Sequence, residues 1–286
     1  DDWSAAVDAA ERAAADHARA GDEIPRADAT VLAALARIEL ARERRGTNPA
    51  AATAAFTAAR RQLGAARAAY AANSRPVAAA MTEVYEGSAL YYDYDLAGAV
   101  RHFATAERAL ATAGAEDERR VVLGNLAVAS ADRGDYRTAA RVYDELLPLL
   151  AARRDEMLAA TLLNGASTRL ALGEAERALG LYVEALGVAA ERDLPRIRIH
   201  ARIGLGSAHL QLGQSELAAA HLEAALAELG DGDRHTRVIA LLRLGEAWRQ
   251  RGRTARADAA HDEAAAIAAT LGSPTLRARI AVTRAD

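Results

Sequence analysis

The sequence predicts an all-α fold, a solenoid built from antiparallel helix hairpins. Four glycines, Gly134, Gly173, Gly213 and Gly252, follow one another at spacings of 39, 40 and 39 residues. A fixed period in this range is typical of helical-repeat arrays. Alanine is the commonest residue and aromatic residues make up only 4% of the chain, which favours closely packed helices over a sheet core.

The positions after each of these turn glycines repeat as well. In a fifth, degenerate copy, Tyr94 stands 40 residues before Gly134, where the glycine is expected. A small residue in one helix and an alanine in the next let two backbones approach closely, and glycine supplies a left-handed turn. Each copy therefore predicts helix A, a tight turn and helix B. The alanines five residues after the turn are Ala99, Ala139, Ala178, Ala218 and Ala257, and the large residues nine after it are Phe103, Tyr143, Tyr182, Leu222 and His261.

These copies predict one solenoid over residues 1–286, since no stretch rich in Pro, Gly or Ser divides the chain. Five regular repeats are expected over residues 75–271. Residues 2–72 predict a looser N-terminal part, with a helix over 2–20 and a hairpin of 27–45 and 49–72. Residues 274–284 predict a capping helix. The unpartnered first helix and the missing initial Met indicate a processed chain or a piece of a longer protein.

The composition excludes several kinds of chemistry. The chain has no Cys and no Lys, because all 36 basic residues are Arg, so thiol nucleophiles, disulfides and phosphate-loop or Schiff-base lysines are ruled out. The seven His are scattered without metal-ligand spacing, and we expect no metal, no other cofactor and no catalytic residue. No apolar run reaches the roughly 18 residues of a membrane span, and no signal peptide is visible, so we expect a cytoplasmic location.

The small, glycine, alanine and aromatic positions resemble the tetratricopeptide repeat (TPR) over roughly residues 75–271. The TPR period is about 34 residues, and the longer period here is similar to that of kinesin light chain. It is also similar to the sensor domains of large bacterial transcription regulators and to peptide-sensing regulators of bacterial quorum systems. The resemblance implies a right-handed superhelix with a concave groove, and a role in signalling. The longer period predicts longer helices or longer turns between hairpins.

The resemblance also implies where a ligand would lie, since the A helices of this family line the concave groove. Asn125 and Asn164 share one repeat position, and an Asn amide can both donate to and accept from a peptide backbone. Tyrosines gather towards one end of the set and arginines towards the other, although packing of Tyr91, Tyr92 and Tyr94 against the first hairpins is an open alternative. The implied ligand-binding residues are Tyr85, Ser88, Tyr92, Asn125, Asp132, Asn164, Ser167, His200, Ser207, Gln211, Arg243, Glu246 and Arg249.

The first function hypothesis is therefore a scaffold or adaptor that holds a protein or peptide in the groove. The alternative is a ligand-sensing regulatory domain of a larger bacterial signalling protein, joined to an effector domain. An enzyme is the third and least favoured alternative. Residues 249–256 are basic but lack interleaved aromatics apart from Trp248, and the net charge is −3, so nucleic acid and membrane are disfavoured as partners.

Overall fold

The structure, a computed structural model, describes residues 2–230, 232–273, 275–276 and 280. These residues form helices and no strand. Contacts group the chain into two compact units, Asp1–Leu146 and Leu147–Asp286, and each unit is described by itself. The single solenoid over residues 1–286 stays a prediction.

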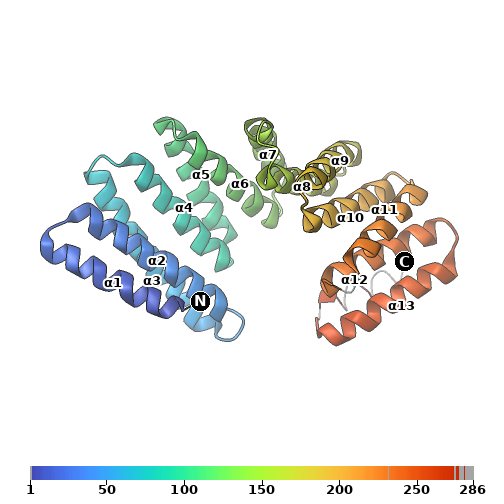
Figure 1. Cartoon of the computed structure of the whole chain (residues 1–286), viewed down its shortest axis with the longest axis horizontal. Helices are drawn as coiled ribbons and strands as arrows, with labels where there is room; N and C mark the ends of the chain where they lie inside the picture. Colours follow the sequence, from blue (N-terminus) through green and yellow to red (C-terminus); the bar gives the residue numbers. More distant parts are fainter. Residues whose placement is uncertain (1, 231, 274, 277–279, 281–286) are drawn as a thin grey trace. The chain divides into compact units, whose positions relative to one another are not determined.

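The first unit holds six complete helices, in which neighbours along the chain pack against one another (Figure 1). The pairing of α2 with α3 and of α4 with α5 gives two hairpins, and α1 packs on α2. The predicted helix over 27–45 begins earlier, at Glu23, because Pro25 is tolerated in a first helical turn, where its missing N–H leaves no bond unmade. The helices are α1 (Trp3–Ala20), α2 (Glu23–Arg44), α3 (Pro49–Ala72), α4 (Pro76–Tyr92), α5 (Leu96–Ala113) and α6 (Glu116–Asp132).

Helix α7 (Tyr136–Leu150) spans the boundary between the units, and six further helices follow it. In the second unit α8 packs on α9, α10 on both α9 and α11, and α12 on both α11 and α13. Most of the predicted cap over 274–284 lies outside the described residues, although Leu276 and Ile280 are buried beside α12 and α13. The helices are α8 (Glu156–Ala171), α9 (Ala175–Glu191), α10 (Pro195–Gln211), α11 (Ser215–Leu229), α12 (Arg234–Gln250) and α13 (Thr254–Leu271).

The repeated side chains form the contacts between helices A and B. All five alanines and all five large residues of the repeat are buried, and His261 takes the ring position as a core residue. The four turn glycines have φ between 68° and 84°, the left-handed conformation predicted for them, and Tyr94 shares it at 66°. From α4 onward the helices have 15 to 18 residues, so longer helices account for the period of 39–40.

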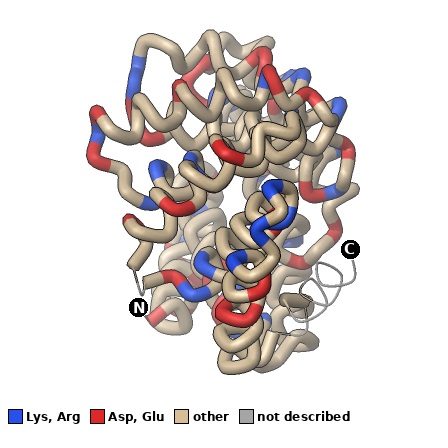
Figure 2. The backbone as a smooth tube through the Cα atoms, turned by 90° about the vertical axis from the view of Figure 1, so that its right-hand side faces the viewer, with Lys and Arg blue, Asp and Glu red and all other residues tan. Residues whose placement is uncertain are grey.

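Polar side chains cap the start of some of the helices. The Asp95 carboxylate, which precedes helix α5, accepts a hydrogen bond from the Gly98 N–H at 2.8 Å. Asp233 does the same for α12, where it accepts from the backbone N–H groups of His235 and Thr236. Figure 2 shows acidic and basic residues interspersed along the helices in its view, in keeping with the small net charge of −3.

Candidate ligand-binding groove

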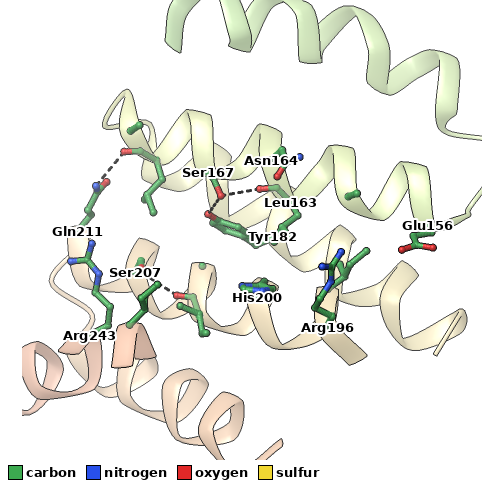
Figure 3. Close-up of a pocket in the computed structure, with 17 residues that line it drawn as sticks. Glu156, Leu163, Asn164, Ser167, Tyr182, Arg196, His200, Ser207, Gln211 and Arg243 are labelled. Carbon is green, nitrogen blue, oxygen red and sulfur yellow. Dashed lines mark hydrogen bonds between the residues drawn. The ribbon is translucent and has the colours of Figure 1, made fainter. Parts of the chain in front are cut away.

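The second unit contains a groove of about 720 Å³ between the facing sides of α8 and α10, to which α12 adds Ile239 and Arg243 (Figure 3). We name it the α8–α10 groove. Its lining recurs every three or four residues along α8 and α10, because residues at that spacing share one helix face. Helices α8 and α10 therefore each contribute one face to the groove, and each face carries both polar and apolar side chains.

The buried ring of Tyr182, a residue of α9, lines the groove, and we call this ring the floor. A Cβ at Gly204 would lie 2.3 Å from that ring, so only glycine lets α10 approach it. The Ser167 hydroxyl donates to the Leu163 carbonyl at 3.0 Å, which leaves the Tyr182 hydroxyl, 2.9 Å away, to donate to Ser167 Oγ. Burial raises the pKa of Tyr182, although its bond to Ser167 opposes the change, so the floor is neutral.

Two polar side chains in the middle of the groove face solvent without internal partners. The Asn164 amide and the His200 ring form no hydrogen bond with any residue that the structure describes. Burial lowers the pKa of His200, and the charge of Arg196 lowers it further, while Asp233 acts in the opposite direction. His200 is therefore uncharged at neutral pH and offers one N–H donor and one acceptor.

Charged groups lie towards the two ends of the groove (Figure 3). Arg196 is exposed and has no ion-pair partner among the described residues, and Glu156 lines the groove at the start of α8. Arg243 pairs with Glu246 at 3.0 Å through one nitrogen, so its charge is compensated while its other N–H groups can still donate to a neutral acceptor. The polar groups of the groove that have no hydrogen-bond partner in the part of the chain that the structure describes are therefore mostly donors.

Six of the thirteen side chains predicted to bind a ligand line this one groove. Their convergence follows from the repeat, since equivalent positions on successive A helices face the same side. The six are Asn164, Ser167, His200, Ser207, Gln211 and Arg243.

The five predicted residues of the first unit are not gathered in one place. Tyr92 and Asp132 line a separate cavity at the ends of α4 and α6. Tyr85 packs against the core around α2 and α3, and the Ser88 hydroxyl donates to the Val84 carbonyl at 3.0 Å. Asn125 is half-buried on α6.

Two predicted residues of the second unit, Glu246 and Arg249, contact neighbouring side chains and do not line the groove. Glu246 holds Arg243, and Arg249 lies 3.3 Å from Nδ1 of His261. The sequence reasoning missed Glu156 and Arg196, which precede the mapped positions on α8 and α10. Arg196 lies one helical turn before His200 on the same face, so extending the helix periodicity by one turn would have found it.

The described residues show neither a metal site nor a membrane span. No three His, Asp or Glu side chains within the described ranges are grouped to hold a metal ion. None of the helices in that part of the chain is long and apolar enough to cross a membrane.

Comparisons with known proteins agree with the repeat geometry. No protein-family model and no curated protein matches the sequence. BtubC (BKLC) from P. vanneervenii is 22% identical, with a TM-score of 0.62 over 77% of this chain and 91% of that one. The Rap conjugation gene regulator of plasmid pLS20, in complex with the Phr* peptide, is 14% identical, with a TM-score of 0.56 over 73% of this chain and 59% of that one.

A Signal Transduction ATPase with Numerous Domains (STAND) protein with a tetratricopeptide repeat sensor, from Pyrococcus horikoshii, is also similar. It is 14% identical, with a TM-score of 0.72, and the match covers 91% of this chain and 39% of that one. At these identities the likeness concerns the fold. The chain has the TPR-like helical-repeat fold that its sequence predicts.

Proposed function

We propose that this protein is a binding module that holds a peptide, or an extended segment of another protein, in the α8–α10 groove. The observation that carries the proposal is the set of unpaired groups in that groove. The Asn164 amide is free to pair with a peptide backbone in both directions, and the exposed Arg196 adds donors for its carbonyl groups. A preformed groove of this kind binds with little backbone change.

The alternating lining supports a peptide rather than a compact small molecule. Leu163 and Ile203 supply apolar contacts beside the polar Asn164 and His200, so successive side chains of a ligand would meet pockets of different character. The likeness to a Rap regulator in complex with the Phr* peptide adds support from the fold. We infer binding rather than catalysis, because the Ser167 hydroxyl is hydrogen-bonded to the Leu163 carbonyl and the Tyr182 hydroxyl instead of to a general base.

Peptide-array screening of the chain, followed by calorimetry on each hit, tests the proposal. Asn164→Ala should weaken binding of groove ligands about tenfold, since a peptide backbone would lose two hydrogen bonds. Asn125→Ala shows whether the equivalent residue of the first unit takes part. Glu223→Gln, an exposed change on α11 outside the groove, is the matched control. Hits whose affinity survives Asn164→Ala and Arg196→Ala together would refute the use of this groove.

A sensor domain of a larger regulator is the second candidate. The match to the STAND protein covers 91% of this chain but only 39% of that one, as expected if such a module is joined to other domains. The length of the natural gene product distinguishes the two candidates. A nucleotide-binding or DNA-binding domain in the same reading frame favours the sensor, and a reading frame that holds the repeats alone favours the adaptor.

A further inference from the structure

A second cavity, in the first unit, has a different chemistry from the α8–α10 groove. It measures about 900 Å³ and lies where α2, α4 and α6 end and where α3 and α5 begin. Three tyrosines line it, although aromatic residues make up only 4% of the chain. We name it the tyrosine groove; its central residues are Arg42, Arg45, Tyr91, Tyr92, Tyr94 and Asp132.

Tyr94 is costly for folding. Its backbone has φ of 66°, a left-handed conformation that costs an L-residue roughly 1–2 kcal/mol, and glycine occupies the same turn position in the other four repeats. Its side chain is 75% exposed and so returns little burial energy. Ser74, Arg154 and Asp193 share this backbone conformation, so the exposed ring rather than the φ angle points to a binding role, because large tyrosines are enriched at binding surfaces.

The other side chains hold the rings in place. The Arg45 guanidinium lies 4.7 Å from the Tyr94 ring centre, and the Arg42 guanidinium lies 4.2 Å from that of Tyr92. The Tyr91 and Tyr92 rings pack edge to face with centres 5.5 Å apart, and the Tyr91 hydroxyl donates to Asp132. The groove is therefore a preorganised set of aromatic faces.

The arginines of this groove do not select an anionic ligand, because their charges are compensated. Arg42 pairs with Glu39 at 2.7 Å, and Arg45 pairs with Asp93 and also donates to the Asp93 carbonyl at 3.2 Å. The Tyr92 and Tyr94 hydroxyls, in contrast, make no hydrogen bond to any residue in the described ranges. The surface offers apolar ring faces and phenolic donors.

From this chemistry we propose that the tyrosine groove binds a proline-rich segment in the polyproline II conformation. Proline rings pack against aromatic faces, and the backbone of such a helix presents carbonyl acceptors but no N–H donors. The ligand is already extended before it binds, so little conformational entropy is lost. This site is separate from the α8–α10 groove and does not depend on the function proposed for it.

Fluorescence anisotropy of the full chain with labelled decaproline tests the proposal, with a Gly-Ser decapeptide and decaglutamate as comparison ligands. We expect decaproline to bind more tightly than either. Tyr94→Gly should weaken decaproline binding tenfold or more, as for an aromatic anchor. It should not lower thermal stability, because glycine is favoured at this φ. Tyr136→Ala, at a tyrosine that does not line the groove, is the control and should leave affinity unchanged.

Three results would overturn the proposal. Equal binding of decaproline and the Gly-Ser peptide would remove the polyproline II preference. Equal affinity of the wild type and Tyr94→Gly would remove the exposed ring from the site. Tighter binding of decaglutamate would show that an acidic segment is the ligand.

Discussion

Gly87 of helix α4 gives the sharpest test of how the repeats pack. A Cβ at this position would lie 2.7 Å from Cε1 and 2.8 Å from Cδ1 of Phe103 on α5, which is closer than side-chain atoms approach. Phe103 is only 2% exposed, so its ring has no free space into which to move. The same arrangement recurs at Gly245, whose Cβ would lie 2.1 Å from Nε2 of His261.

The expected cost of Gly87→Ala is the balance of two opposing effects. Overpacking a filled core costs about 1–3 kcal/mol. Replacing glycine by alanine inside a helix stabilises it by roughly 0.5–1 kcal/mol, because the unfolded chain loses freedom. The net loss in the free energy of unfolding should be about 1 kcal/mol, within a range of roughly 0–2.5 kcal/mol.

Gly64→Ala in α3 supplies the matched control. This glycine also lies inside a helix of the first unit, but a Cβ there would meet no atom within 4 Å. Only the favourable helix effect remains, so Gly64→Ala should stabilise the chain by about 0.5–1 kcal/mol. Urea unfolding followed by far-UV circular dichroism measures both variants. If Gly87→Ala proves as stable as Gly64→Ala, close approach of α4 to the Phe103 ring is not what places glycine at this position.

Two further predictions concern titrating carboxylates. Glu86 is 5% exposed, and burial raises its pKa although Arg67 and His102 oppose the change. The contribution of Glu86 to stability is therefore fully present below pH 4.5, its ordinary pKa, and is lost as pH rises through the raised value. Glu86→Gln should therefore flatten the fall of the urea unfolding midpoint above pH 4.5. An unchanged slope would contradict this. Hydrogen bonds from Thr236 lower the pKa of Asp233. Asp233→Ala should therefore lower the free energy of unfolding by about 1 kcal/mol at neutral pH. This difference from the wild type should disappear as pH falls below 3.8, the ordinary value, and through the lowered pKa. Equal destabilisation of the Asp233 variant at pH 7 and pH 2.5 would refute the capping role.

The repeat geometry could be predicted from the sequence because it is local. The left-handed turn at Gly134, the close packing at Ala99 and the buried ring at Phe103 all follow from residue type at a fixed spacing. Long-range pairings could not be predicted in this way. Nothing in the local pattern shows that Arg67 reaches Glu86 at 3.1 Å, or that Arg45 pairs with an acid 48 residues away.

The candidate site was also only partly predictable from the sequence. Repeat position alone indicated Asn164 and Asn125 equally, yet the structure places only Asn164 in the α8–α10 groove. Asn125 lies on α6 in the first unit, whereas Asn164 lies on α8, where Gly204 of the neighbouring helix leaves room for the Tyr182 ring that lines the groove. A repeat position specifies the direction of a side chain, but the residues that surround it come from other positions of the chain.

The two proposed sites would use the same repeat for different ligands. Both contain arginine, but the arginines act differently because their partners differ. Arg196 has no ion-pair partner within the described part of the chain and can meet a ligand carbonyl or carboxylate, whereas Arg45 pairs with Asp93 and stacks on Tyr94. Under the two proposals, the ligand that each groove prefers depends on which of its lining residues are already paired in the folded chain, and not only on which residue types line it.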